Sequence, residues 1–122
     1  AHAGWRGLAA GVVEQTVAAM SVPAAELIAW LGPCIGIERF EVGPEVRDAL
    51  LTGDKGAEAC FRAGRGDRWY TDLQALARRR LIALGVSSVT AAVACTFENS
   101  HRFFSFRRDG SCGRMATLIW RE

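Results

Sequence analysis

The stretch Ala1-His2-Ala3-Gly4-Trp5-Arg6-Gly7-Leu8 places an imidazole and a guanidinium among small residues, directly before a helical pattern begins. Free backbone N–H groups at the start of a helix attract anions, and glycines let a backbone come close to a ligand. We therefore expect His2 and Arg6 to bind an anion or a metal-bound anion. A surface turn with a stacked Trp5–Arg6 pair stays open as the alternative, because one histidine does not make a metal site.

Outward from this stretch, apolar residues at helical spacing predict a core-packed helix over residues 7–20. Pro23 breaks the pattern, and the continuous apolar run 27–31 predicts a buried strand. A helix followed by a buried strand is typical of an α/β fold. We expect one domain over residues 1–122, of class α/β with mixed α and β layers.

The remaining elements follow from start and stop signals. Residues 53–68 have the composition of a loop with a brief helical possibility around 57–61, and Thr71 to Gln74 fit a capping box. The other expected elements are a helix over 44–51 that begins at Pro44, a helix from 73 to 84 that Gly85 ends, a buried strand over 86–95, a strand with alternating aromatics at 103–106, and a last apolar strand over 115–120.

Composition excludes several classes of protein. The 15 Lys and Arg against 13 Asp and Glu give a net charge of +2, which does not predict a nucleic-acid groove. The four cysteines are widely spaced, which excludes a zinc finger or a Cys-x-x-Cys redox motif. No apolar run approaches the roughly 20 residues of a membrane span. We expect a cytoplasmic protein with reduced thiols, and the opening without Met suggests a fragment.

Two single residues have a functional and a structural interpretation. Cys34 lies in the turn Gly32-Pro33-Cys34-Ile35-Gly36 after an expected strand, where α/β folds often bind ligands, but a small buried thiol is the more frequent case. His101 has the chemistry of a proton shuttle, although a lone histidine in a polar loop is more often solvated.

Five motifs in order resemble the YfiH family, also called the laccase-domain or multicopper polyphenol oxidase family, whose fold resembles cytotoxic necrotizing factor. The motifs are His2 to Gly7, Gly32 to Gly36 with Phe40-Glu41-Val42-Gly43, Asp72-Leu73, Cys95-Thr96, and Phe103 to Arg108 followed by Gly113-Arg114-Met115-Ala116. The resemblance covers essentially the whole chain. It implies the later part of a YfiH-like domain whose N-terminal part is missing.

The resemblance also implies a function and a metal. It implies a zinc-dependent purine nucleoside phosphorylase, acting on adenosine, inosine, guanosine and methylthioadenosine with phosphate, that also deaminates adenosine. His2 matches the second of two histidines that hold one zinc ion together with a cysteine. The other two ligands belong to motifs upstream of His2, so neither Cys34 nor His101 takes their place.

Phosphorolysis requires cations that hold phosphate, and the planar guanidinium suits this role. Arg6 is the first candidate, followed by Arg107 and Arg114 of the last motif. A structural ion pair of Arg107 or Arg114 with Asp72 or Glu41 stays open as the alternative. The aromatic rings of this motif, at 103, 104 and 106, have faces that stack on purines, although at most one of them is expected to reach a ligand.

Three other functions remain open. A polyphenol oxidase, as the family was formerly named, would need many histidines, and this chain has two. A hydrolase that edits peptidoglycan precursors would use the upstream cysteine as its nucleophile. The third is a non-catalytic binding module that associates with a partner or with a second copy of itself.

Overall fold

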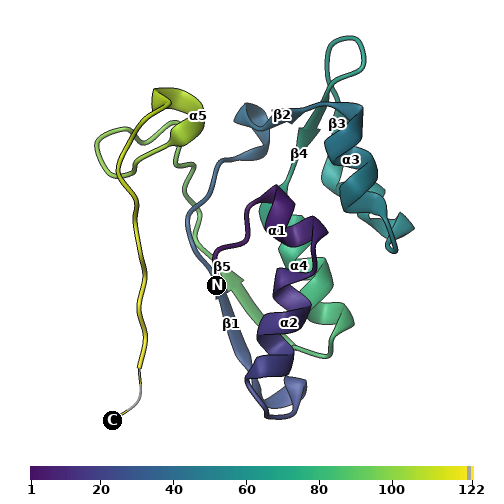
Figure 1. The fold of residues 1–122 in the computed structure, drawn as a ribbon, viewed down its shortest axis with the longest axis vertical. Coiled ribbons are helices and arrows are strands. Elements are labelled where there is room, and N and C mark those ends of the chain that lie inside the picture. Colours follow the sequence, from purple (N-terminus) through teal and green to yellow (C-terminus); the bar gives the residue numbers. More distant parts are fainter. Residues whose placement is uncertain (121) are drawn as a thin grey trace.

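A computed structural model describes residues 1–120 and 122, and its helices and short strands form the mixed α/β arrangement of Figure 1. In chain order the described elements are the helices and strands α1 (Trp5–Ala9), α2 (Val12–Ala19), β1 (Ile28–Leu31), β2 (Glu41–Val42), α3 (Pro44–Leu51), β3 (Phe61–Ala63), β4 (Trp69–Thr71), α4 (Leu73–Ala83), β5 (Ser88–Ala91) and α5 (Phe106–Asp109), with 3-10 turns at Ala24–Glu26, Ile37–Arg39 and Lys55–Cys60.

The first helix is interrupted, so the expectation of one continuous helix over residues 7–20 was wrong. Gly11 adopts a left-handed conformation with φ of 82° between α1 and α2. A residue with a Cβ pays a steric cost there, which glycine avoids. The break turns α2 relative to α1 and lets Leu8, Ala9 and Val13 reach the core from two directions.

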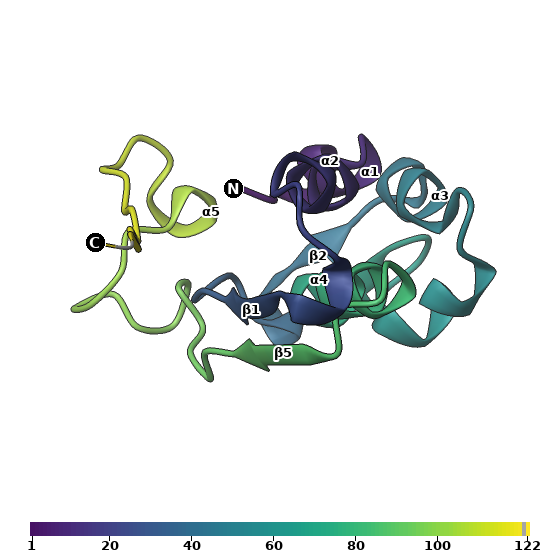
Figure 2. The same ribbon diagram turned by 90° about the horizontal axis from the view of Figure 1, so that it is seen from below.

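Helix α4 is the central element of the fold. It contacts α2 and the sheet of β1 and β5, and Figure 2 shows it between these two layers. Its predicted inner face is confirmed, because Leu76, Ala77 and Leu81 are buried. The capping box was predicted one residue too early: the Asp72 carboxylate, not Thr71, caps the helix by accepting a hydrogen bond from the Ala75 N–H at 2.9 Å.

Strands β1 and β5 form a two-stranded parallel sheet in which Ile28 pairs with Ser88 and Trp30 with Thr90. Helix α4 lies against this sheet, and Ala29 and Leu31 of β1 pack against the core. The strand expected over 27–31 therefore exists, but it is not buried on both faces, because Ile28 is 81% exposed and Trp30 52% exposed.

A second, antiparallel sheet has the strand order β2, β4, β3. Of its three strands, only β3 falls in the stretch 53–68 that the sequence predicted as loop, and there the 3-10 turn at 55–60 corresponds to the brief helical expectation around 57–61. Strands of two or three residues are too short to show alternating hydrophobicity. The sheet contacts the 55–60 turn, and Arg47 of α3 lies over the Phe61 and Trp69 rings, 5.8 Å and 4.2 Å from their centroids. Such tertiary contacts influence strand formation more than local sequence does.

The core lies between α1, α3 and α4, where the side chains of Leu8, Leu50, Leu76 and Val86 are almost fully buried. The helix expected over 44–51 is confirmed as α3, with Pro44 in its first turn. None of the described helices has the length and apolar character needed to cross a bilayer.

The C-terminal part departs most from expectation. Residues 103–106 do not form the expected strand, and α5 begins at Phe106. Residues 115–120 form no strand within the described chain, and Figure 1 shows this segment running extended along one side of the molecule. Its sequence has the apolar character of a strand, but no neighbouring strand is present in the described structure to pair with it.

Candidate functional site

His2 lies on the segment that leads into α1, Arg6 lies in the first turn of that helix, and both residues are exposed. The Arg6 guanidinium lies over the Trp5 ring, 4.4 Å from its centroid, as the stacked alternative required. Within the described part of the chain Arg6 takes part in no ion pair. The guanidinium is therefore held by an aromatic face while its N–H groups stay available to an anion.

Gly4 keeps the space beside His2 open. A Cβ at this position would lie 3.2 Å from His2 Nε2, closer than most real contacts. Gly7 is also restricted, because its Cβ would lie 3.3 Å from Val12 Cγ1. The two glycines that the sequence pointed to are thus explained by close packing at the start of α1.

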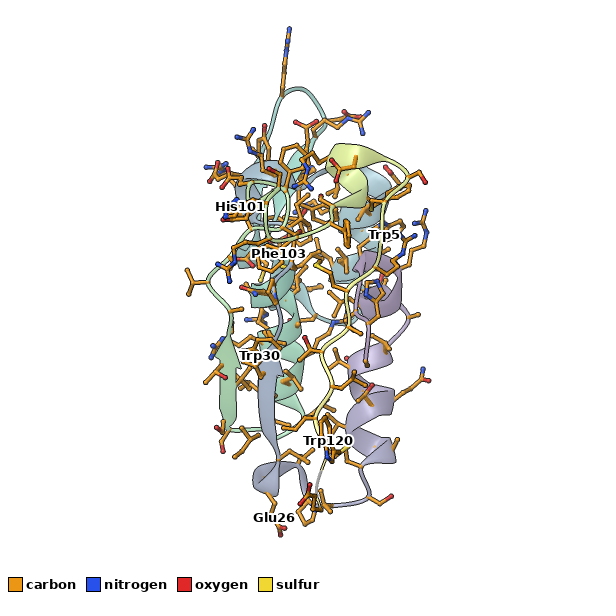
Figure 3. The ribbon with its side chains drawn as sticks, turned by 90° about the vertical axis from the view of Figure 1, so that its left-hand side faces the viewer. Trp5, Glu26, Trp30, His101, Phe103 and Trp120 are labelled. Carbon is orange, nitrogen blue, oxygen red and sulfur yellow. The ribbon has the colours of Figure 1, made fainter. Side chains whose placement is uncertain are left out.

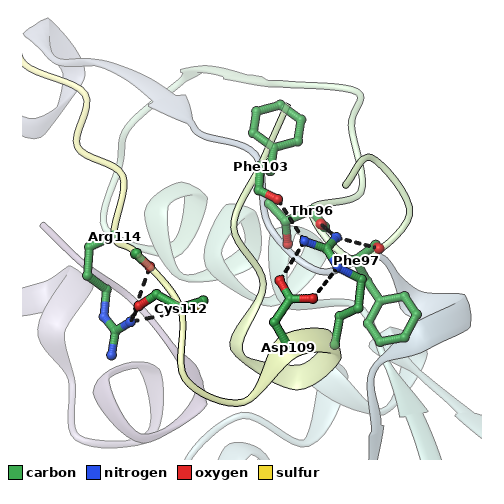
Figure 4. Close-up of polar contacts among 8 residues, drawn as sticks. Thr96, Phe97, Phe103, Asp109, Cys112 and Arg114 are labelled. Carbon is green, nitrogen blue, oxygen red and sulfur yellow. Dashed lines mark hydrogen bonds and ion pairs between the residues drawn. The ribbon is translucent and has the colours of Figure 1, made fainter. Parts of the chain in front are cut away.

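Arg107 and Arg114 each donate hydrogen bonds to backbone carbonyl oxygens. Arg107 donates to the backbone carbonyl of Glu41 at 3.0 Å and lies 5.1 Å from the centroid of the Phe40 ring. Arg114 donates to the carbonyls of Cys112 at 2.9 Å and Gly113 at 3.2 Å (Figure 4). The structure shows neither arginine in an ion pair with Asp72 or Glu41 among the described residues.

Among the described residues, no hydrogen bond or ion pair joins Arg107 or Arg114 to His2 or Arg6. His2 and Arg6 share a segment, Arg107 fastens α5 to the strand β2, and Arg114 belongs to the extended C-terminal segment. His2 and Arg6 are exposed and four residues apart, and neither side chain has a hydrogen bond or ion pair among the described residues. They are the candidate site of this chain.

Arg108 joins α5 to the preceding loop, a role that the sequence did not predict. Its guanidinium donates to the carbonyls of Thr96, Phe97 and Phe103 at 2.8–2.9 Å and pairs with Asp109 at 2.7 Å (Figure 4). The paired guanidinium holds the pKa of the Asp109 carboxyl below its usual range. The only signal in the sequence was the neighbouring Arg-Arg-Asp, which does not reveal contacts 5 to 12 residues away.

Cys34 belongs to the end of the parallel sheet. Its backbone forms an isolated parallel β-bridge with that of Cys95, and both thiols are free. The Gly36 N–H donates to Cys95 Sγ at 3.2 Å. Both cysteines line an open pocket of about 220 Å³ together with Asp72 and Gln74. Burial, followed by the negative charge of Asp72, raises the pKa of the Cys34 thiol to about 11. A thiol that stays protonated is a poor nucleophile, so the structural interpretation of Cys34 is favoured.

The last motif keeps its aromatic side chains largely at the surface. Phe104 and Phe106 are exposed and Phe103 is half-buried, with the Arg102 guanidinium 5.1 Å from the centroid of the Phe103 ring. His101 is exposed in the same loop, and Figure 3 shows it near Phe103. The position of His101 agrees with a solvated histidine. Two of the three rings are open to solvent, and the expectation that at most one reaches a ligand stays a prediction.

Zinc ligation by this chain alone does not fit the residues present. Across residues 1–120 and 122 no group of three His, Cys, Asp or Glu side chains is placed to hold a metal ion. His2 can supply one neutral imidazole, whereas protein zinc sites use three or four ligands. A complete zinc site would therefore require ligands from outside the described residues.

These features define a class of protein: a mixed α/β unit that offers an exposed histidine and arginine but only part of a site. The family model for multi-copper polyphenol oxidoreductase laccase matches residues 1–122. The chain belongs to this family, which includes the YfiH and DUF152 proteins.

Curated relatives carry a different description. The chain is 48% identical over 120 residues to purine nucleoside phosphorylase YfiH of Escherichia coli, covering 98% of this chain and 49% of the relative. It is 50% identical over 121 residues to purine nucleoside phosphorylase PA4543 of Pseudomonas aeruginosa, covering 98% and 50%. The chain thus spans about half the length of the curated relatives it matches.

Solved structures show the same fold. Neisseria meningitidis protein NMB0706 matches with a TM-score of 0.88 at 47% identity, covering 90% of this chain and 46% of that one. Bacillus licheniformis protein YfiH matches with a TM-score of 0.84 at 26% identity, covering 90% and 44%. The mixed α/β architecture predicted from the sequence is therefore confirmed as that of YfiH/DUF152 structures.

Proposed function

We propose that this chain supplies part of the active site of a purine nucleoside phosphorylase, with His2 as one zinc ligand and Arg6 as a phosphate contact. The observation that carries the proposal is the exposed pair His2 and Arg6 on one short segment. It stands in a chain about half identical to proteins named purine nucleoside phosphorylase. The substrates would be phosphate and adenosine, inosine, guanosine or methylthioadenosine.

Phosphorolysis transfers a ribosyl group. A phosphate oxygen forms a bond to the anomeric carbon as the bond from that carbon to the purine nitrogen breaks, and the purine leaves with a proton. Adenosine and phosphate thus give adenine and ribose 1-phosphate. The guanidinium of Arg6, supported by the Trp5 ring, would bind phosphate oxygens through a planar pair of N–H donors and fix their direction.

Adenosine deamination is the finer part of the proposal. It replaces the exocyclic amine of adenosine with oxygen from water and releases ammonia, giving inosine. Zinc, when bound, would supply an activated water for this reaction. His2 of this chain would act only as a ligand, and the remaining ligands would come from outside the described residues.

The test uses a hybrid chain, defined as the Pseudomonas aeruginosa relative in which the residues matched here are replaced by this 122-residue chain. We expect the hybrid chain to release adenine from adenosine only when phosphate is present. H2A should abolish the release while the folded hybrid persists, and the matched control H101A should retain it. An active H2A hybrid, or a folded but inactive hybrid beside an active parent, would contradict the proposal.

Arg6 has its own readout. R6A should raise the KM for phosphate more than the KM for adenosine, because the guanidinium contacts only the oxyanion. R65A, at the exposed tip of the β3–β4 hairpin, is the matched arginine control and should change neither constant. Equal effects of R6A on both constants would remove Arg6 from the phosphate site.

Polyphenol oxidation is the second candidate, and only the name of the matching family model favours it. Its test is metal analysis together with a phenol oxidation assay on the same hybrid preparation. Phosphorolysis by copper-free protein would exclude a copper requirement for that activity.

A further inference from the structure

Among residues 1–120 and 122, the sheet of β1 and β5 is covered on one face only. Helix α4 packs against the face that carries Ala29, Leu31 and Val89. The opposite face carries Ile28 and Trp30, which are 81% and 52% exposed, next to the exposed Ser88 and Thr90. Parallel sheets occur almost only where both faces are covered, and they rarely consist of two strands alone.

The edges of this sheet are also unpaired within the described chain, since β1 and β5 pair only with each other. An unpaired strand edge presents backbone N–H and C=O groups that another strand satisfies. An occupant of this surface therefore needs both an apolar face for Ile28 and Trp30 and a polypeptide backbone for the edge. These two requirements favour a β-strand of a protein over a lipid surface or a small ligand.

The C-terminal segment is a second open surface. Leu118, Ile119 and Trp120 are 79%, 97% and 78% exposed, and residues 111–120 form no backbone hydrogen bond with the rest of the described chain. Figure 3 views the molecule from the side on which the C-terminal segment lies, and it labels Trp30 and Trp120. A chain of this size rarely exposes so many large apolar side chains unless they mark an interface.

We propose that the outer face of β1 and β5 together with residues 115–120 forms a docking surface for a polypeptide corresponding to the half of its relatives that this chain does not match. The structures that share its fold are about twice as long, and this chain covers 46% of the Neisseria meningitidis protein at a TM-score of 0.88. The occupant pairs with the free edge of the parallel sheet and buries Ile28 and Trp30. This inference concerns folding contacts and is independent of the enzymatic proposal.

Hydrogen exchange of the isolated chain and of the hybrid chain tests the proposal without nucleoside, phosphate or metal. We expect backbone amides of residues 28–31 and 115–120 to exchange at least about 100-fold more slowly in the hybrid chain. Amides of α3 and α4 should be protected in both proteins, because their helical hydrogen bonds form within this chain, and they serve as the internal reference. Equal exchange at 28–31 and 115–120 in both proteins would overturn the proposal, and so would a hybrid chain that shows no cooperative unfolding beside a cooperative parent.

A matched pair of variants separates docking from general destabilisation. I28D with W30D should lower the unfolding midpoint of the hybrid chain and leave that of the isolated chain nearly unchanged. I82D is the control, because Ile82 is also an exposed apolar residue, but it lies on α4 outside the proposed surface. An equal shift from both changes in the hybrid chain would overturn the proposal. Homodimers of the isolated chain that protect 28–31 would do the same, because they would identify a second copy as the occupant.

Discussion

Two regions of this molecule differ in how they use apolar residues. The helical core, α1 to α4 with β2 to β4, encloses side chains such as Leu50 and Leu76 that are at most 1% exposed. The open region, β1, β5 and residues 93–120, leaves comparable side chains in solvent, including Ile28 and Ile119. The helical core is closed by contacts within the chain, whereas a parallel sheet and an extended segment need further strands.

The largest expected difference between the regions is in stability. L50A should lower the free energy of unfolding of the isolated chain by about 2–5 kcal/mol, because it leaves a cavity in the helical core. L118A should change it by less than about 0.5 kcal/mol, because Leu118 is already exposed. Urea unfolding measures both, and similar losses would show that the two regions are packed alike.

The N-cap of α4 should contribute more to stability than a surface ion pair does. D72A should cost about 1 kcal/mol, because it removes the acceptor of the Ala75 N–H. The control D67A, in the exposed β3–β4 turn, should cost little, since its pair with Arg68 is a surface contact at 3.6 Å. Thermal or urea unfolding of the two variants compares them, and equal costs would contradict the capping role.

Cys34 should make the stability of the fold depend on pH. Its pKa is raised to about 11 in the fold from an ordinary value of about 9, so between these values the unfolded chain has lost a proton that the folded chain keeps. The free energy of unfolding should therefore fall as pH rises from about 9 to about 11. C34A should flatten this fall, while C112A, in the extended segment, should not. Urea unfolding across this pH range measures the effect, and identical profiles would contradict the burial of Cys34.

The smallest global effect is expected for Arg108. R108K should speed hydrogen exchange in residues 96–109 with little change in the unfolding of the helical core. The three donors of a lysine ammonium cannot replace the five hydrogen bonds that the Arg108 guanidinium makes to three carbonyls and to Asp109. R102K is the matched control in the same loop. Faster exchange throughout α4 in R108K would show that the two regions are not separable.

Sequence periodicity predicted the helical core well, because α3 and α4 bury residues at helical spacing within one segment. Leu73, Leu76, Ala77 and Leu81 were expected to face inward and do so. The break at Gly11 was missed, and the cap of α4 was placed one residue early, at Thr71 instead of Asp72. Strands β3 and β4 are three residues long, which is too short for alternation to be visible.

The open region was predicted less well for a physical reason. Residues 27–31 and 115–120 have the apolar character of buried strands, but burial and pairing depend on neighbours that the described chain does not supply. In the candidate site, His2 and Arg6 were predicted because a glycine-rich turn precedes a helix, and the structure shows only that both residues are exposed. Arg107 was expected to bind phosphate or an ion-pair partner, yet it fastens α5 to the Glu41 carbonyl, a contact 66 residues away that no local pattern encodes.

We have proposed that His2 is one ligand of a zinc site whose other ligands lie outside the described residues. Zinc content after dialysis tests this most directly. We predict about one zinc ion per hybrid chain, and far less than one in both the isolated chain and the H2A hybrid. One tightly held zinc ion in the isolated chain, or an undiminished content in the H2A hybrid, would contradict it.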